Sequence, residues 1–268
     1  MVQTYGSYLA LDELLELQRP RSEGPHGAEH DEMLFIVIHQ VYELWFKQVL
    51  HELDWLQRAL EAAETARATD TLKRVLTIFK TLVSQIDVLE TMTPVSFSSF
   101  RSRLDSASGF QSVQFREVEF VLGHRRAAMV EHMPEGSAER RRLQELLDAP
   151  SVYDSFLAYL AEIGYPVPRD VLERDDRTEP VEDERIRELL VDVYHGRHGA
   201  RDFTVRQICE RLVDLDEGLQ EWRYRHVKMV ERTIGFKKGT GGSAGSAYLR
   251  TTLFQPLFPD LWAIRAQL

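Results

Sequence analysis

One stretch of the sequence decides the fold: residues 208–233 read ICERLVDLDEGLQEWRYRHVKMVERT. Its apolar side chains recur at steps of four and three residues, which is the spacing of one face of an α-helix. The members of this stripe are Ile208, Leu212, Leu215, Leu219, Trp222, His226, Met229 and Thr233. The sequence therefore predicts a long helix whose apolar face, including His226, points toward the core.

Two interpretations of His226 are open. A single histidine on an apolar face is usually a core residue that is hydrogen-bonded through one ring nitrogen. The other interpretation is a cofactor ligand, which the segment 239–246, GTGGSAGS, favours because a glycine-rich backbone can fold closely over a ligand. His39 repeats the pattern, since Phe35, Tyr42 and Phe46 share its helical face. Bundles build cofactor sites from facing helices, so the two histidines together indicate a pocket in a bundle core.

The rest of the chain shows the same 3.6-residue periodicity and almost no strand signal, so we predict an all-α helical bundle. The long helices are expected over residues 31–63, 71–90, 112–131, 181–194 and 202–234, with shorter helices after the N-caps Ser137 and Ser151. Residues 164–183 contain three prolines and many charges, and we expect a surface connection there. We expect residues 1–268 to form a single domain.

Composition excludes several classes of protein. The 268 residues include 43 Asp and Glu against 33 Lys and Arg, for a formal net charge of -10. An acidic surface attracts neither phosphate backbones nor anionic lipids, so we expect no nucleic acid and no membrane as a partner. Cys209 is the only cysteine, which excludes an internal disulfide, a Cys-rich zinc site and a covalent c-type haem. Without a signal peptide or a long apolar run, the chain is expected to be cytoplasmic.

Other metal sites match the sequence poorly. A di-iron bundle needs Glu-x-x-His on two helices, but Glu23 with His26 is the only match and lies in a segment rich in Gly and Pro. His30 and Glu32 resemble part of a facial-triad iron site, which is normally mounted on strands. A haem held by one neutral imidazole is the best account of a buried histidine without a second ligand motif.

Arg101 stands among large apolar residues, where two roles are open. Such an arginine is usually a surface residue or the partner of a structural carboxylate. It can instead clamp a substrate carboxylate, because the guanidinium presents two parallel donors.

Several longer motifs carry a resemblance that spans the chain. They are YGSYL at 5–9, HDEMLFI at 30–36, HQVYELWFK at 39–47, the stretch 92–115 with SGFQS at 108–112, and RYRH at 223–226 followed by GTGGS at 239–243. With these motifs in this order, the chain resembles the tryptophan 2,3-dioxygenase family, whose members use haem to open the indole ring of L-tryptophan.

The resemblance implies roles for named residues. His226 would be the proximal ligand of a b-type haem, with O2 binding on the opposite face, beneath a turn formed by Ser108 and Gly109. His39 would hydrogen-bond the indole nitrogen of L-tryptophan, and Arg101 would pair with its carboxylate. The residues expected to complete the substrate site are Thr240 at the amino-acid end, Phe35, Phe97 and Leu104 as walls, and Tyr5 and Tyr8 from a neighbouring subunit.

The same resemblance implies an assembly and a reaction. The N-terminal segment, about residues 1–30, would pack on a neighbouring subunit of a homotetramer, a dimer of dimers. The enzyme would add both atoms of O2 across the indole C2–C3 bond to give N-formylkynurenine, the first step of tryptophan catabolism by the kynurenine pathway. Two alternatives stay open: a haem oxygenase for a modified indole in secondary metabolism, and a haem sensor without turnover.

Overall fold

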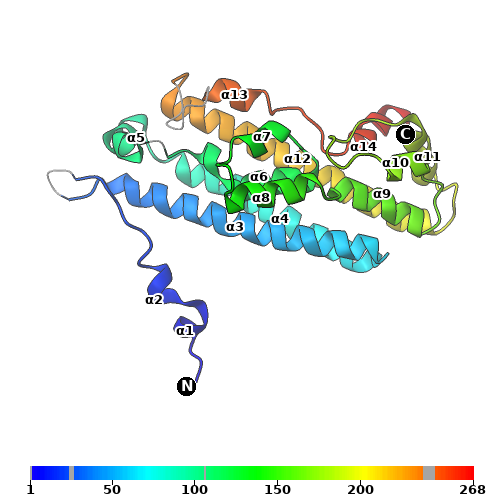
Figure 1. Ribbon diagram of the computed structural model, residues 1–268, viewed down its shortest axis with the longest axis horizontal. Coiled ribbons are helices and arrows are strands. Elements are labelled where there is room, and N and C mark those ends of the chain that lie inside the picture. The colour runs from blue at the N-terminus through cyan, green and yellow to red at the C-terminus, as the bar shows by residue number, and fades with distance from the viewer. Residues whose placement is uncertain (1, 24–26, 106, 238–244) are drawn as a thin grey trace.

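The computed structural model describes residues 2–23, 27–105, 107–237 and 245–268. Within these ranges it contains helices and no β-strand, which confirms the all-α prediction. Three long helices run along the molecule, and α4 packs against both of the others (Figure 1). They are α3 (His30–Glu61), α4 (Thr65–Leu89) and α12 (Arg201–Ile234).

Shorter helices cover this three-helix core. On α3 lie α6 (Val113–Leu122) and α9 (Val152–Glu162), while α8 (Ala138–Leu147) packs on α6 and α11 (Glu184–Tyr194) packs on α12. The other short helices that follow α3 are α5 (Pro94–Arg101), α7 (Ala127–Glu131), α10 (Arg169–Leu172), α13 (Ser246–Arg250) and α14 (Pro259–Ala263). The described ranges also contain three 3-10 turns: η1 (Ser102–Leu104), η2 (Gly109–Gln111) and η3 (Ile264–Gln267).

The apolar stripe of α12 holds this helix in the core. Its members from Ile208 to Trp222 are buried, and fully burying one leucine stabilises a fold by roughly 1.5–3 kcal/mol relative to leaving it exposed. From His226 onward the stripe is only half-buried, because its last residues line a pocket. The stripe therefore changes from core to pocket wall within one helix.

One prediction is wrong, because the structure has two helices where the sequence predicted one. The expected helix over 112–131 ends at Gly123 and restarts at Ala127, as α6 and α7. Gly123 has φ of +111°, and a Cβ there would lie 3.2 Å from the ring of Pro180. The left-handed glycine ends α6 and turns the chain, so that His124 and Arg125 are buried instead of continuing the helix, with His124 next to Arg223 of α12. The N-caps at Ser137 and Ser151 are confirmed, because both hydroxyls accept a backbone N–H.

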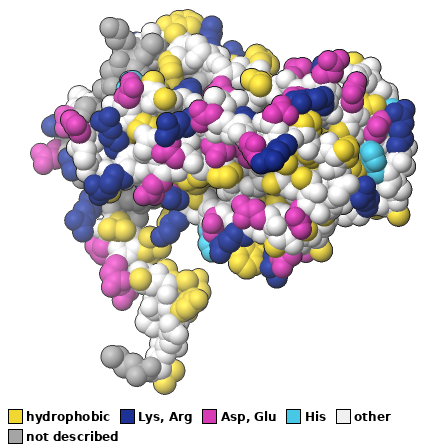
Figure 2. Space-filling model, turned by 45° about the vertical axis from the view of Figure 1, so that its right-hand side comes forward, with side chains coloured by type: hydrophobic (Ala, Val, Ile, Leu, Met, Phe, Trp, Pro, Cys, Tyr) yellow, Lys and Arg dark blue, Asp and Glu magenta, His cyan; other side chains and the backbone are white. Residues whose placement is uncertain are grey.

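The N-terminal arm projects away from the bundle (Figure 1). Its helices α1 (Tyr5–Leu9) and α2 (Leu11–Leu14) bury no residue, and apolar side chains lie exposed along it (Figure 2). The arm is tied to α3 at its base, where the backbone N–H groups of Arg21 and Ser22 donate to the buried Glu32 carboxylate at 2.8 and 2.9 Å. None of the helices in the described ranges is long and apolar enough to cross a membrane.

Candidate active site

Most of the expected site residues line one pocket between α3, α5, α6 and α12. The pocket holds about 1680 Å³ of empty space, including its opening to solvent. The expected residues that line it are Phe35, His39, Phe97, Arg101, Leu104, Ser108, Gly109 and His226.

The roles of the other three expected residues stay predictions. Thr240 lies outside the described residues, so its role stays a prediction. Tyr5 and Tyr8 are 77% and 71% exposed on α1, which points away from the bundle of its own chain. Because they are expected to act in a neighbouring subunit, their role stays a prediction as well.

His226 presents a neutral imidazole to the pocket. Its ring is stacked on Trp222 with a centroid distance of 5.2 Å and an interplanar angle of 8°. Burial lowers the pKa of His226 to about 4, with smaller contributions from His39 and Arg116. The unprotonated ring is the form that can ligate a metal ion.

His39 faces the same pocket from α3, and its hydrogen bonding fixes its tautomer. The Nδ1 atom lies 2.7 Å from the carbonyl oxygen of Phe35, which can only accept, so Nδ1 carries the proton. Burial lowers the pKa of His39 below its ordinary value, so the ring is neutral near pH 7. The Nε2 atom is then a hydrogen-bond acceptor.

Aromatic rings form the wall next to His39. The Phe35 ring lies 4.1 Å from the His39 ring and 5.8 Å from that of Phe97, measured between centroids. Phe100, fully buried, anchors α5 behind them and thereby places Arg101, half-buried, at the end of this helix. The wall is therefore apolar, with one guanidinium at its edge.

The turn at Ser108 and Gly109 is held by its own capping interactions. The Ser108 hydroxyl accepts the N–H of Phe110 at 3.3 Å, and the backbone N–H of Ser108 donates to the Gln111 side chain at 3.3 Å. Both residues line the pocket, so a short 3-10 turn forms part of its boundary.

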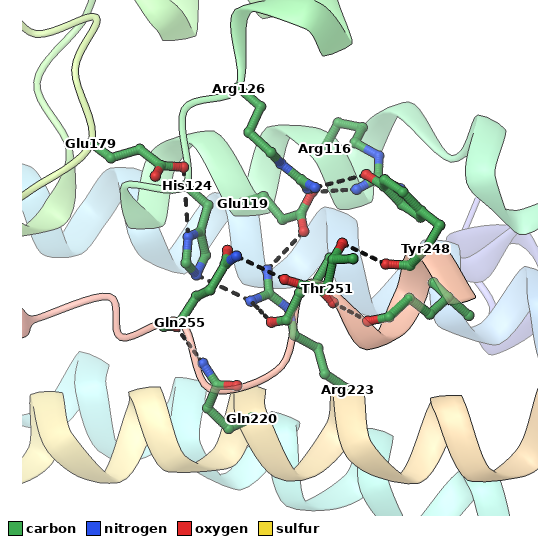
Figure 3. Close-up of polar contacts among 12 residues, drawn as sticks. Arg116, Glu119, His124, Arg126, Glu179, Gln220, Arg223, Tyr248, Thr251 and Gln255 are labelled. Atoms are coloured by element: carbon green, nitrogen blue, oxygen red, sulfur yellow. Dashed lines mark hydrogen bonds and ion pairs between the residues drawn. The ribbon is translucent and has the colours of Figure 1, made fainter. Parts of the chain in front are cut away.

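A buried group of charges that the sequence reasoning missed forms another part of the wall. Glu119 accepts hydrogen bonds from Arg116, from Arg126 at 2.8 Å and from Arg223 at 2.7 Å (Figure 3). Arg116, Glu119 and Arg223 line the pocket. The spacing of Arg116 and Glu119, three residues apart, is also that of an ordinary surface ion pair, so no local pattern indicated that they are buried.

The residues of the pocket fit a haem. His226 supplies a neutral imidazole, and the surrounding walls are largely apolar and aromatic. Within the described ranges, no three His, Cys, Asp or Glu side chains are grouped so that they could hold a metal ion. A haem iron needs only one protein ligand, because the porphyrin supplies the others.

Comparison with known proteins decides the family. The family model described as tryptophan 2,3-dioxygenase matches residues 1–150 and 171–268. The chain belongs to the tryptophan 2,3-dioxygenase family. This confirms the resemblance seen in the sequence motifs.

The similarity to individual tryptophan 2,3-dioxygenases extends over nearly the whole chain. It is 57% identical to the enzyme of Herpetosiphon aurantiacus, with 99% of this chain and 98% of the relative covered. For the enzyme of Anaeromyxobacter sp. the identity is 59%, with 99% and 96% covered. The enzyme of Pseudomonas fluorescens is 40% identical, with 99% and 91% covered.

Proposed function

We propose that this chain is a haem-dependent dioxygenase that adds both atoms of O2 across the indole C2–C3 bond of L-tryptophan and releases N-formylkynurenine. One observation carries the proposal: two neutral histidines, His39 of α3 and His226 of α12, line the same aromatic pocket together with Arg101. Membership of the tryptophan 2,3-dioxygenase family supports this reaction class.

In this proposal His226 would hold the iron of a b-type haem, and the turn at Ser108 and Gly109 would contribute to the pocket that encloses it. The bound ferrous haem supplies the activation of O2. The protein contributes binding and orientation. Holding the indole in a reactive position removes much of the entropic cost of bringing the reactants together.

His39 orients the indole ring. Its Nε2 accepts a hydrogen bond from the indole N–H, because Nδ1 is already bonded to the Phe35 carbonyl. The indole N–H is not acidic near neutral pH, and the lowered pKa of His39 makes its ring a weak base. We therefore assign His39 a hydrogen-bonding role and not that of an obligatory base.

The amino-acid end of L-tryptophan is bound by charge. The Arg101 guanidinium pairs with the substrate carboxylate, which it can engage through two parallel N–H donors. Thr240 contacts the same end of the substrate. Phe35, Phe97 and Leu104 enclose the indole, so the ring lies between apolar walls while its polar end is anchored.

We also propose that the N-terminal arm completes the site of a neighbouring subunit in a homotetramer, a dimer of dimers. The arm exposes Tyr5, Tyr8, Leu9 and Leu15 and buries nothing in α1 or α2 within its own chain. A connected group of exposed apolar side chains is typical of an interaction surface.

The proposal is tested by turnover of the haem-loaded protein. The protein is reconstituted with haem b, reduced without oxygen and titrated with L-tryptophan, and O2 is then added while N-formylkynurenine absorbance is followed. We expect product to form in proportion to the O2 consumed. Faster turnover of a substituted indole would indicate the secondary-metabolism alternative, and haem binding without turnover would indicate the sensor.

A further inference from the structure

Four charged side chains, three of them buried and one partly exposed, are grouped at the wall of the pocket that holds the proposed proximal ligand. We call Arg116, Glu119, Arg126 and Arg223 the arginine cluster (Figure 3). Glu119 is 1% exposed, Arg116 and Arg223 are each 4% exposed, and the two carboxylate oxygens of Glu119 are shared among the three guanidiniums. The cluster joins α6, the segment after it and α12.

The cluster carries more positive than negative charge. Three guanidiniums face one carboxylate, which leaves a surplus of two positive charges. Burial opposes ionisation of the Glu119 carboxyl, but the guanidiniums of Arg116, Arg223 and Arg126 hold its pKa below the ordinary value. Glu119 is therefore ionised, and the surplus of two positive charges already includes its negative charge. His124, whose Nε2 lies 3.1 Å from Arg223, adds no charge, because burial and Arg223 lower its pKa to about 3.

Other groups around the cluster offset this surplus only weakly. The half-exposed Glu179 lies 3.9 Å from Nδ1 of His124, and Arg126 donates to the Tyr248 hydroxyl at 2.7 Å. The Nε atoms of Arg116, Arg126 and Arg223 have no hydrogen-bond partner among the described residues. The described contacts therefore leave the cluster with a net positive charge at the pocket wall of the haem-free chain.

Packed rings connect the cluster to His226. The Arg116 guanidinium lies 5.4 Å from the centre of the Phe115 ring, and Phe115 lies 4.8 Å from Trp222. Trp222 is stacked on His226 at 5.2 Å. Arg223 precedes His226 by three residues on α12, a spacing that places the two side chains on neighbouring turns of one face. Arg116 also lies 5.2 Å from the centre of the Phe110 ring, so the cluster adjoins the pocket between His226 and the turn at Gly109, with Arg116 and Arg223 largely shielded from water.

We propose that the arginine cluster raises the reduction potential of the haem and so favours its ferrous form. The inference rests on the proposed function, because it requires a haem held by His226. Reduction of Fe(III) to Fe(II) adds one electron and removes one positive charge from the iron, which makes nearby positive charge less unfavourable. A unit charge about 10 Å from a redox centre, at an effective dielectric constant of about 20, changes such an equilibrium by roughly tenfold.

The test is the midpoint potential of haem-loaded variants of the full chain, measured by spectroelectrochemical titration. Arg116→Met removes one charge while Glu119 keeps its bonds to Arg126 and Arg223. We expect the ferrous-to-ferric ratio at a given potential to fall roughly tenfold, which corresponds to about 59 mV for one electron. Arg116→Lys keeps the charge and should stay near the wild-type potential.

A matched control separates the cluster from general charge effects. Arg142→Met removes a half-exposed arginine of α8, whose field is screened by solvent, and should leave the potential unchanged. Arg126→Met is the second test variant, because it removes a charge from the cluster and leaves Arg116 in place. It should shift the potential in the same direction as Arg116→Met.

Three results would overturn the inference. The first is a wild-type potential in Arg116→Met and Arg126→Met proteins that carry a full haem complement. The second is an equal shift in Arg116→Lys and Arg116→Met, which would assign the effect to packing. The third is loss of haem from both methionine variants, which would make the cluster a structural requirement. Wild-type protein that binds no haem would instead refute the proposed function.

Discussion

His124 should make the stability of the haem-free protein depend on pH. Its ring is 4% exposed, and its Nε2 lies 3.1 Å from the Arg223 guanidinium, which can only donate. The folded protein therefore needs the unprotonated ring, and burial together with Arg223 lowers the pKa of His124 to about 3. A histidine in the unfolded chain titrates near 6.5. Between these two values only the unfolded state gains a proton.

The sign and the size of the effect follow from this difference. A group whose pKa is lowered by folding contributes stability above its unfolded pKa, and this contribution is lost as the pH falls. From pH 7 to pH 5, His124 should lower the free energy of unfolding by about 2 kcal/mol. The figure depends little on the folded pKa, because pH 5 lies well above it.

The assay compares wild type with His124→Gln by urea denaturation at both pH values. Glutamine keeps an acceptor oxygen for Arg223 but does not titrate, so the variant should lose about 2 kcal/mol less than wild type between pH 7 and pH 5. Other buried histidines and the carboxylates contribute to both proteins and cancel in the comparison. His51→Gln, at an exposed position of α3, is the control and should behave as wild type. An identical pH dependence in His124→Gln and wild type would refute the reasoning.

Three further predictions concern the proposed site. Arg101→Leu should weaken apparent tryptophan affinity by roughly thirtyfold, the lower end of the range for truncating one member of a buried charge pair, because Arg101 is only half-buried. The same variant should lose far less affinity for tryptamine, which lacks the carboxylate. As a control, Arg103→Leu at an exposed position should weaken tryptophan affinity far less than Arg101→Leu. Equal losses of tryptophan and tryptamine affinity in Arg101→Leu would contradict the role of Arg101 as carboxylate anchor. His226→Ala should lose stable haem binding, as measured by haem content and absorbance, and added imidazole should partly restore it. A full haem complement with an unchanged spectrum in this variant would rule out His226 as the haem ligand. Deleting residues 2–10 should impair tryptophan binding and leave haem content largely intact, whereas a fully active monomer at low concentration would disprove a shared site.

Helical periodicity was sufficient to predict the architecture, because the three long helices have continuous apolar faces. Boundaries were less predictable. The expected helix over 112–131 contains apolar residues on both sides of Gly123, so periodicity alone gave no reason to end it there. The break comes from a left-handed glycine held against Pro180, a contact between segments far apart in the chain. Such tertiary contacts leave no trace in a local pattern.

The pocket was predictable only in part, for a similar reason. His39 and His226 could be paired because both lie on apolar helical faces, and family motifs supplied the rest of the expected set. The arginine cluster could not be predicted, since Arg116, Glu119 and Arg126 have the composition of an exposed helix surface. Their burial results from α6 packing against α3 and from Arg223, more than a hundred residues later, meeting Glu119 at 2.7 Å.

Comparison of the histidines also bears on the question that the sequence left open, whether His226 is a core residue or a ligand. A core histidine is expected to have a hydrogen-bond partner. His39 has one in the Phe35 carbonyl, and His124 has one in Arg223. Within the described ranges no side chain or backbone group is hydrogen-bonded to His226, which instead lies stacked on Trp222 at the wall of a large pocket. A metal ligand needs one unprotonated ring nitrogen that is free to bind the iron, and the described residues leave such a nitrogen on His226, as its proposed role requires.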